Sequence, residues 1–469
     1  MTSPVRADVI SRLKAVLGEG GWSQDPERIA SKLVEWRGRW TGQTPLLALP
    51  KSTAEVSAVV GICAETGTAI VPQGGNTGLV SGQIPKGELL LSTERLRTIR
   101  DVDAFDDVIV AEAGVTLAAV HEAAEEKRRR FPLSLASEGS ATIGGLVSTN
   151  AGGTQVLRYG TMRDLVLGLE AVLPNGEVWN GLKRLRKDNT GYDLKQLLIG
   201  AEGTLGVITA ASLKLFPILP SRAVAMCAVA SPADAIRLLA RAKDETGGQV
   251  EAFELMSRLG VAFALKNIPG LREPLEAKHP WYVLIEAASG EPGAAEAGLE
   301  RVLSGALDDG LVTDAAIAQT EAQAKAFWAV RENQSGGQRP EGAAWKHDVS
   351  VPVSRIADFI ETATAAVKRF APDARVVAFG HVGDGNVHYD VLRAEGGDDV
   401  RHNALRDEGS RIVHDIVADR GGSISAEHGL GAMKTAEALR YKSAVEVEAL
   451  RAVRQALDPK RIMNPRVLF

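Results

Sequence analysis

The stretch PQGGNTGLVSG, from Pro72 to Gly82, directly follows a short apolar segment at 68–71 that is typical of a buried strand. It holds four glycines in eleven positions. Because it has so few side chains, its backbone N–H groups can approach a ligand and converge on phosphate oxygens. It contains no GxGxxG dinucleotide fingerprint, and no GKS or GKT of a Walker loop follows it. On its own, the stretch is equally compatible with a surface turn.

Composition and charge are those of an ordinary globular protein. The 469 residues are too many for one hydrophobic core, so we expect two or three domains. Hydrophobic residues make up 45% of the chain, and the formal net charge is −5, which argues against nucleic acid as a partner. The basic run KRRR at 127–130 follows a helix-like pattern, where cations favourably close a helix C-terminus.

Cysteine usage and the N-terminus bear on the compartment. Cys63 and Cys227 both lie in apolar runs, which argues against a disulfide framework and fits a reducing environment. The N-terminus lacks the apolar segment of a signal peptide, and no apolar run approaches about 20 residues. We therefore expect a cytoplasmic protein with no transmembrane segment.

The first half of the chain alternates helix and strand patterns. The sequence STAE at Ser52 is a capping-box signature, and apolar residues from Val56 to Cys63 form one helical face that Gly67 ends. Further patterns predict an N-terminal helix, two strands, a second helix and a β-hairpin, at 5–17, 89–91, 108–113, 116–127 and 165–179.

A second glycine-rich region, SEGSATIGGLVSTNAGGTQVLRYG, spans Ser137–Gly160. It combines six glycines with small hydrogen-bonding side chains. Loops of this length inside a compact domain are usually functional, so we expect a functional loop here. A third small-residue segment, GAEGTLGVI at Gly200–Ile208, leads into a predicted strand at 209–216.

Three of the eight histidines lie in two short segments, FGHVGDGNVHYDV at Phe379–Val391 and SAEHGLG at Ser425–Gly431. Two imidazoles and a carboxylate are a ligand set that zinc accepts, and three protein ligands with one open position form a catalytic site. The spacing HxxxxxxH is a weak pattern, and two ordinary histidines would also fit it. The turn-forming residues Gly383, Asp384 and Gly385 lie between the two histidines and would let both rings meet one ion.

Six motifs follow one another in a fixed order: PQGGNTGL, the region from SEGSATIGG to RYG, GAEGTLGVIT, HVGDGNVH, AEHGLG and LDPKRIMNP. Together they resemble the FAD-linked oxidase superfamily, which has the vanillyl-alcohol oxidase fold. The resemblance runs from about residue 45 to Phe469. Within the superfamily, the motifs are similar to the branch of D-2-hydroxyglutarate dehydrogenase, D-lactate dehydrogenase and the glycolate oxidase flavin subunit.

The resemblance implies an α+β fold, with a two-subdomain FAD-binding domain of vanillyl-alcohol oxidase type and a ferredoxin-like antiparallel-sheet cap. We expect the FAD domain at 1–220, the substrate (cap) domain at 221–420, and a C-terminal segment at 421–469 that returns to the FAD domain. The two prolines of LFPILPSR, at 215–222, interrupt the strand pattern and agree with the first boundary. Strands alternating with helices in the cap suit a ferredoxin-like plan.

The resemblance also implies the residues that bind FAD. They are Pro72, Gly74, Gly75, Asn76, Thr77, Gly78, Leu79, Ser137, Gly139, Ser140, Thr142, Gly144, Gly145, Asn150, Gly152, Glu202, Gly206, Val207, Ile208 and Asn464. Many relatives attach FAD covalently through a histidine in the first loop. This sequence has no histidine between Val71 and Pro85, so we expect non-covalent FAD.

By the same resemblance, Arg331 and Lys346 correspond to a pair that anchors the substrate carboxylate, and Ser335 stands where relatives have a threonine. For an isolated arginine and lysine, a solvated salt bridge is the simpler explanation. His381, His388 and Glu427 would be the ligands of a divalent metal, zinc by their chemistry, and His428 the general base. One departure is Asp390, where a relative has asparagine.

The implied activity is oxidation of a D-2-hydroxy acid, such as D-2-hydroxyglutarate, D-lactate or D-malate, to the 2-oxo acid. The two alternatives are the flavin subunit of a glycolate oxidase-like complex and a non-redox FAD enzyme of the ether-lipid synthase type. Two cysteines cannot hold a Cys-ligated iron–sulfur cluster. Electrons must therefore pass to an acceptor such as oxygen, an electron-transfer flavoprotein, a quinone or a cytochrome, and the resemblance also allows a homodimer.

Overall fold

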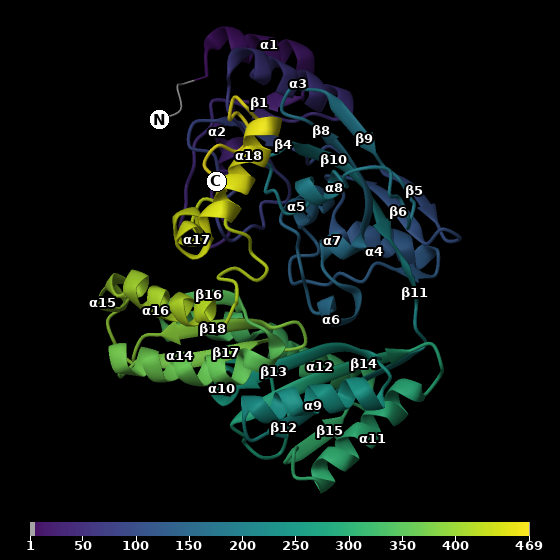
Figure 1. Cartoon of the computed structure of the whole chain (residues 1–469), viewed down its shortest axis with the longest axis vertical. Coiled ribbons are helices and arrows are strands. Elements are labelled where there is room, and N and C mark those ends of the chain that lie inside the picture. The colour runs from purple at the N-terminus through teal and green to yellow at the C-terminus, as the bar shows by residue number, and fades with distance from the viewer. Residues whose placement is uncertain (1–4, 469) are drawn as a thin grey trace. The chain divides into compact units, whose positions relative to one another are not determined.

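A computed structural model describes residues 5–468. The chain forms two compact units (Figure 1). Unit 1 contains residues 5–153, 160–218 and 427–468, and unit 2 contains Thr154–Tyr159 and Leu219–Ala426. The boundaries expected from the sequence were 220 and 420, whereas the main crossings in the structure follow Ile218 and Ala426. The short segment Thr154–Tyr159 belongs to unit 2 because it packs on that unit's sheet.

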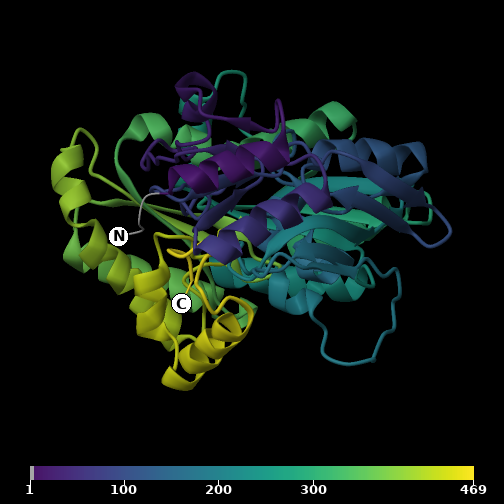
Figure 2. The same cartoon turned by 90° about the horizontal axis from the view of Figure 1, so that it is seen from above.

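The first sheet of unit 1 has the strand order β1-β2-β4-β3, in which β3 and β2 run parallel to β4. Its strands are β1 (Trp22–Ser23), β2 (Leu47–Ala48), β3 (Ile70–Gln73) and β4 (Leu89–Ser92). The helices around it are α1 (Ala7–Leu17), α2 (Pro26–Ala30) and α3 (Thr53–Thr66). The first and third of these lie side by side, as the purple helices in Figure 2 show. Their apolar faces share one buried core with the strands.

The predicted cap of α3 by Ser52 is confirmed, because the Ser52 side chain accepts a hydrogen bond from the Glu55 backbone N–H. The full capping box is not confirmed, because the Glu55 carboxylate accepts from the Lys51 N–H and not from the N–H of the cap residue Ser52. At the other end, Gly67 has a φ of 67°, in the left-handed region that glycine enters without strain. This helix therefore begins and ends where the sequence requires, and it delivers the chain into β3.

The second sheet of unit 1 is antiparallel, with the strand order β5-β6-β10-β8-β9. Its strands are β5 (Ile99–Asp103), β6 (Val108–Glu112), β8 (Val166–Val172), β9 (Val178–Gly181) and β10 (Val207–Lys214). A small sheet joins β7 (Arg129–Arg130) to β11 (Phe216–Pro217). The helices of this part are α4 (Leu117–Glu126), α5 (Ile143–Ser148), α7 (Met162–Leu165) and α8 (Lys195–Leu198).

The C-terminal segment of unit 1 contains α17 (Thr435–Tyr441) and α18 (Ala444–Leu457). It returns to the first elements of the chain, and in Figure 1 the yellow α18 lies among the purple ones. The Ile70 N–H donates to Ile462 O at 2.8 Å, and the Asn464 N–H donates to Ile70 O at 2.8 Å. Residues after α18 thus extend the edge of the first sheet beside β3.

Unit 2 is built on one seven-stranded antiparallel sheet with the order β15-β12-β14-β13-β17-β18-β16. Its strands are β12 (Ser221–Val229), β13 (Val250–Ser257), β14 (Trp281–Ser289), β15 (Asp314–Ile317), β16 (Ala344–Ser350), β17 (Arg375–His381) and β18 (Asn386–Leu392). The helices are α6 (Val156–Tyr159), α9 (Pro232–Glu245), α10 (Arg258–Asn267), α11 (Ala294–Asp308), α12 (Glu321–Glu332), α13 (Gln334–Gly337), α14 (Ile356–Phe370), α15 (Asp399–Ala404) and α16 (Arg406–Asp419), with 3-10 turns η1 (Arg339–Glu341) and η2 (Val353–Arg355).

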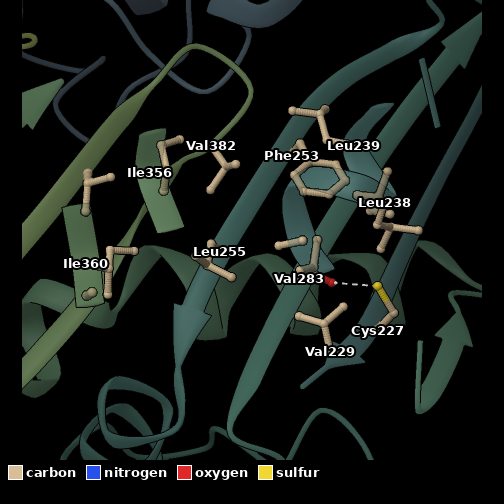
Figure 3. Close-up of a cluster of buried hydrophobic side chains, with 14 of the residues drawn as sticks. Cys227, Val229, Leu238, Leu239, Phe253, Leu255, Val283, Ile356, Ile360 and Val382 are labelled. Atoms are coloured by element: carbon tan, nitrogen blue, oxygen red, sulfur yellow. Dashed lines mark hydrogen bonds between the residues drawn. The ribbon is translucent and has the colours of Figure 1, made fainter. Parts of the chain in front are cut away.

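The order β12-α9-β13-β14-α11-β15 is a βαββαβ unit, which confirms the predicted ferredoxin-like cap. One face of the sheet packs against α9, α11, α14 and α16 in the largest buried core of this unit. Figure 3 shows part of that core, where Phe253, Val283 and Leu238 meet and the Cys227 thiol donates to Val283 O at 3.5 Å. The other face packs against α10 and α12. That second face carries the charged side chains described below.

Candidate functional site

Unit 1 contains a cavity of about 560 Å³ at the C-terminal end of β3. The first glycine-rich loop forms one wall, and the start of α5 and the segment before it form another. The third small-residue segment and the C-terminal segment close the remaining sides. All three small-residue motifs of the sequence therefore converge on one cavity within one unit.

Two glycines allow the first loop to lie against the second region. A Cβ atom on Gly74 would lie 2.4 Å from the Thr142 hydroxyl oxygen. A Cβ atom on Gly75 would lie 1.8 Å from Ser140 O, a backbone atom that cannot swing aside. The next residue, Asn76, has a φ of 57°, and its side-chain amide donates to two carbonyls of the segment after α2. The loop is therefore shaped by close backbone approach, with Asn76 anchoring its turn.

The region Ser137–Gly160 differs from the expected long loop because it contains α5 and α6. Glycine is a poor helix former, but here tertiary packing outweighs that preference. A Cβ on Gly144 would lie 2.7 Å from the Ala113 Cβ, so only glycine lets α5 pack this closely on the end of β6. The helical geometry brings the start of α5 to the cavity.

Several buried polar atoms beside the cavity have no hydrogen-bond partner within residues 5–468. They are the Thr142 hydroxyl, the Gln73 side-chain carbonyl and the Asn464 side-chain carbonyl. Unpaired buried polar groups cost about 1–3 kcal/mol each, so a polar ligand at this wall would be stabilised by them. A cofactor with phosphates, a ribityl chain and a heteroaromatic ring offers the groups they lack, so these residues fit FAD.

Glu202 connects the third segment to the C-terminal segment. Its carboxylate accepts hydrogen bonds from the Leu430 N–H at 2.9 Å and the Gly431 N–H at 2.8 Å. Burial raises the pKa of Glu202, although the two N–H groups and Lys434 oppose this. The residues just before these donors, Glu427 and His428, both line the cavity. The carboxylate thus anchors the predicted catalytic segment at the predicted cofactor cavity.

The cavity brings together most of the residues expected to bind FAD. All of them line it except Gly139, which is exposed, and Asn150, whose side-chain oxygen accepts a hydrogen bond from the Arg163 N–H. The sequence did not reveal several other lining residues, which are Trp36, Gln73, Gly82, Gln83, Thr93, Leu135, Ser148, Thr149 and Gly203. Five of these residues lie inside quoted motifs and could have been included on that ground, namely Gln73, Gly82, Ser148, Thr149 and Gly203. Trp36 comes from a segment with no such pattern.

Unit 2 contains a buried charged cluster of Glu254, Arg331 and His381. Glu254, on β13, is fully buried. It accepts a hydrogen bond from Arg331 Nε at 2.6 Å and another from His381 Nδ1 at 2.6 Å. Burial alone would raise the pKa of Glu254, but the charges and hydrogen bonds of Arg331 and His381 outweigh it and lower the pKa to about 2. Hydrogen bonds between charged side chains thus connect β13, α12 and the end of β17.

The second predicted ligand, His388, lies on β18 next to this cluster. Its ring stacks on Phe379, with 4.8 Å between ring centroids, and the centroids of His381 and His388 are 6.1 Å apart. Asp348 lies opposite it on β16, with 4.0 Å between the Asp348 carboxylate and His388 Nδ1. The structure therefore brings both predicted histidines together within unit 2.

The turn between the two histidines follows the sequence prediction, because residues 382–385 connect β17 to β18 as a tight hairpin. Gly385 has a φ of 93°, and a Cβ there would lie 2.3 Å from Val351 O. Burial raises the pKa of Asp384 against the lowering effect of His381. The Asp384 side chain also accepts a hydrogen bond from the Asn386 N–H at 3.0 Å, which closes the turn.

The other predicted substrate residues have different surroundings. Lys346 Nζ lies 3.4 Å from the carboxylate of Asp390, its partner across β16 and β18. Ser335 is exposed on α13. Arg331 is buried, and its guanidinium lies over the Phe379 ring at 5.2 Å. Each of the two predicted carboxylate anchors thus already has an acidic partner.

The hydrogen bond between Glu254 and His381 determines what this histidine can offer. A buried carboxylate of low pKa only accepts hydrogen bonds, so His381 must donate from Nδ1. When the ring is neutral, Nε2 would carry the lone pair, which is the form that binds a metal ion. Carboxylate–histidine pairs of this kind orient metal ligands in many sites. Glu254 was not identified from the sequence, because β13 shows no alternation of polar and apolar residues.

The comparisons with known proteins agree with this geometry. Residues 218–468, more than half of the chain, match the family of FAD linked oxidases, C-terminal domain. Residues 44–181 match an FAD binding domain. The chain belongs to the FAD-linked oxidase family. It is thus an FAD-linked oxidoreductase, and the family resemblance noted from its motifs is confirmed.

Individual relatives extend over nearly the whole chain. A protein of Bos taurus named D-2-hydroxyglutarate dehydrogenase, mitochondrial, is 39% identical over 99% of this chain and 84% of its own length. A probable D-2-hydroxyglutarate dehydrogenase, mitochondrial, of Oryza sativa subsp. indica is 38% identical over 99% of this chain and 82% of its own length. The solved structure of p-cresol methylhydroxylase superposes with a TM-score of 0.77 at 16% identity and covers 98% of this chain and 96% of its own. The last likeness confirms the vanillyl-alcohol oxidase type of fold.

None of the helices within residues 5–468 is both long and apolar enough to cross a membrane. The relatives named above are called mitochondrial, so the cytoplasmic location expected from the sequence stays a prediction.

Proposed function

We propose that this chain is a dehydrogenase that oxidises a D-2-hydroxy acid to the corresponding 2-oxo acid with FAD and a divalent metal ion. The observation that carries the proposal is the buried Glu254–His381 pair, which engages Nδ1 of His381 and orients its ring beside His388. The names of the relatives support the class of substrate. The cavity of unit 1 supports the cofactor.

FAD would bind in the cavity of unit 1 through the glycine-rich loops, with Thr142, Gln73 and Asn464 as polar partners. When bound, FAD supplies an acceptor for the hydride that leaves C2 of the substrate. The chain would hold this cofactor in position. No histidine lines the loop from Val71 to Pro85, so we expect acid denaturation to release the flavin. Yellow colour retained on the denatured protein would show a covalent link instead.

A zinc ion would be held by His381, His388 and Glu427, and would supply a Lewis acid for the 2-hydroxyl of the substrate. His381 and His388 already lie together in unit 2. Glu427 follows Ala426 directly, and the Ala426 N–H donates to Asp348 O at 3.2 Å. Asp348 in turn lies opposite His388. We propose Glu427 as the third ligand because it is the first residue after this hydrogen-bonded end of unit 2.

His428 would take the proton of the 2-hydroxyl. It lines the cofactor cavity of unit 1, and Glu202 anchors the segment that follows it. Imidazole has an ordinary pKa near 6.5, which suits a general base at neutral pH. The proton taken by His428 and the hydride accepted by FAD together account for the two hydrogens that the hydroxy acid loses.

Arg331 would bind the substrate carboxylate with the two Nη groups, because only its Nε is committed to Glu254. Lys346 and Ser335 would assist. Lys346 also faces Asp390, whose negative charge disfavours a second carboxylate on the substrate. The preference for a substrate side chain of a given length and charge therefore depends on the Lys346–Asp390 pair. Comparing turnover of D-2-hydroxyglutarate, D-lactate and D-malate tests this preference.

The decisive test is anaerobic bleaching of the flavin by a panel of D-2-hydroxy acids, with the L-enantiomers as controls. Bleaching by at least one D-acid is expected. An enzyme of the ether-lipid synthase type would keep its flavin oxidised with every member of the panel, and that result would refute the proposal. Adding electron-transfer flavoprotein, a soluble quinone or cytochrome to the reduced enzyme then identifies the class of electron acceptor.

Metal analysis tests the zinc assignment separately. We expect about one zinc per chain in the wild type and loss of both metal and turnover in His388→Ala. His279→Ala is the matched control, because His279 pairs with Asp314 on another part of the same sheet. Full turnover after complete removal of the metal by a chelator would contradict the assignment and leave the flavin chemistry intact.

A further inference from the structure

A second cavity of about 300 Å³ lies in unit 1, near the C-terminal end of β10. Ile208 near the start of β10 lines the FAD cavity, whereas Lys214 at its end lines this one. A strand rises about 3.3 Å per residue, which separates the two residues by about 20 Å. The lining residues are Arg163, Asp164, Val166, Leu167, Leu185, Arg186, Lys195, Gln196 and Lys214.

Within residues 5–468, four cationic side chains and one carboxylate line this cavity. The positive groups come from α7, α8, the end of β10 and the segment between β9 and α8. The single carboxylate, Asp164, is already engaged as the helix cap of α7, where it accepts a hydrogen bond from the Thr161 N–H at 2.9 Å. The cavity therefore has a net positive charge.

Three of the four cations donate only to neutral oxygen atoms. The Arg163 guanidinium donates to Gln196 O at 2.9 Å, to the Gln196 side-chain carbonyl at 2.7 Å and to Ile199 O at 2.7 Å. Arg186 donates to Asp106 O at 3.4 Å, and Lys214 donates to Asp164 O. Lys195 alone pairs with a carboxylate, that of Asp193. None of the other three forms an ion pair within residues 5–468, although the Asp164 carboxylate acts on Lys214 through its charge.

The charges also act on one another. Burial lowers the pKa of Lys214, and the positive charges of Arg186 and Lys195 lower it further, although Asp164 opposes them. Like charges that share a partly enclosed site favour an anion, which relieves their repulsion and accepts their hydrogen bonds. Guanidinium groups in particular match the geometry of phosphate and carboxylate oxygens.

We propose that this cavity binds a small multivalent oxyanion, either a phosphate or a compact polycarboxylate. The site would be separate from the FAD cavity, and it would hold the segment between β9 and α8, which contributes Leu185 and Arg186. That segment is largely exposed, and it contains four basic residues, Lys183, Arg184, Arg186 and Lys187. Bound anion would therefore slow cleavage of this segment by trypsin.

The test uses the FAD-loaded enzyme, so that the glycine-rich loop is already occupied by its cofactor. Titration calorimetry with inorganic phosphate should show one binding site per chain. Arg186→Met removes an exposed cation from the cavity and is expected to weaken binding about tenfold or more, as Lys214→Met should. Lys183→Met is the matched control, because Lys183 lies in the same segment, pairs with Asp188 and does not line the cavity.

Three further measurements complete the test. Citrate in place of phosphate shows which oxyanion the cavity prefers, and trypsin cleavage after Arg184–Lys187 should slow with either. If sodium chloride at matched ionic strength slowed trypsin cleavage as much as phosphate or citrate, the proposal would be overturned. Unchanged phosphate affinity in the Arg186→Met/Lys214→Met double variant would overturn it too. Binding of polyglutamate without any binding of phosphate or citrate would also overturn it, and would indicate an acidic protein partner instead.

Discussion

The cavity of unit 1 that we propose for FAD and the charged cluster of unit 2 are built in opposite ways. The cavity is formed mainly by backbone and small side chains from a few contiguous stretches, and its contacts depend on the absence of Cβ atoms at Gly74 and Gly75. The cluster consists of three long charged side chains, Glu254, Arg331 and His381, from three separate elements. The first is stabilised by close approach, whereas the second is stabilised by hydrogen bonds from Arg331 and His381 to one buried carboxylate.

This difference determines which substitutions damage each region. A backbone cradle tolerates many changes but not an added atom at a point of contact. A buried charge network tolerates little loss, since removing one partner leaves the others charged and desolvated. The predictions below test this contrast, and they run from the largest expected effect to the smallest.

Glu254→Gln should be the most damaging change. It leaves Arg331 without a counter-ion and His381 without its carboxylate partner, which costs about 3–5 kcal/mol of unfolding free energy. Urea unfolding of the purified protein measures this loss, and zinc content should fall with it. Glu273→Gln is the control, because its pair with Arg258 is partly exposed and should lose only about 1 kcal/mol or less.

The same carboxylate predicts a pH dependence. The pKa of Glu254 falls from an ordinary value of 4.5 to about 2 in the folded protein. Its stabilising contribution is therefore present above pH 4.5 and is lost as the pH falls towards 2, by about 3 kcal/mol in total. The stability difference between wild type and Glu254→Gln should shrink over this range. A difference that stays constant from pH 5 to pH 3 would contradict the ionised state of Glu254.

Gly75→Ala should break the cradle of unit 1. The added methyl would lie 1.8 Å from Ser140 O, so the loop must shift, and FAD affinity should fall about 100-fold, or about 2.7 kcal/mol. Flavin fluorescence during dilution measures the dissociation. Gly139→Ala is the matched control, since no atom lies within 4 Å of its Cβ position and Gly139 does not line the cavity. Equal FAD loss in the two variants would refute the cradle.

Glu202→Gln tests the anchor between the third segment and the C-terminal segment. A glutamine oxygen can still accept one N–H, from Leu430 or Gly431, but its amide then faces the other donor. We expect turnover to fall about tenfold, or about 1.4 kcal/mol, with FAD content unchanged. Loss of FAD in proportion to activity would mean that Glu202 acts on the cofactor instead. The exposed Glu177→Gln serves as the control.

Asp390→Asn should have the smallest effect on stability and a measurable one on selectivity. It removes the negative partner of Lys346, which leaves the ammonium group free to attract a carboxylate. The ratio of kcat/KM for D-2-hydroxyglutarate to that for D-lactate should rise by about threefold to tenfold. An unchanged ratio would show that Lys346 does not contact the substrate side chain. Asp373→Asn, exposed and in the same unit, should leave the ratio unaltered.

The contrast also explains what could be predicted from the sequence. Short sequence patterns correctly predicted elements that depend on contacts between residues close in the chain. These are the Ser52 cap of α3, the hairpin of β8 and β9, and the turn from His381 to Asn386. The Gly-rich loops could be assigned to FAD only through the family resemblance, because small residues alone also fit a surface turn. The helix α5 was missed because its glycines disfavour a helix, and only packing against Ala113 selects one.

The charged cluster could not be predicted, because its members are far apart in the sequence. Every residue of β13 is buried, including Glu251 and Glu254, so the strand lacks the alternation that identifies a half-exposed strand. Two buried glutamates are stable only when partners arrive from elsewhere: Arg158 and Tyr159 for one, Arg331 and His381 for the other. Pairing over such distances leaves no local pattern.

The return of the C-terminal segment to the edge of β3 has a consequence for biosynthesis. Ile70 is hydrogen-bonded to Ile462 and Asn464, and the Asn464 side chain donates to Gly82 O and Glu202 O at the cavity wall. Unit 2 has all its residues once Ala426 has been synthesised, whereas unit 1 still lacks these contacts. Chains emerge from the ribosome at about 5–20 residues per second, so the middle of the sequence can fold before the first part is complete. If the cavity binds FAD as proposed, the flavin would bind late, after residues 462–464 have reached a cavity whose other walls were translated hundreds of residues earlier.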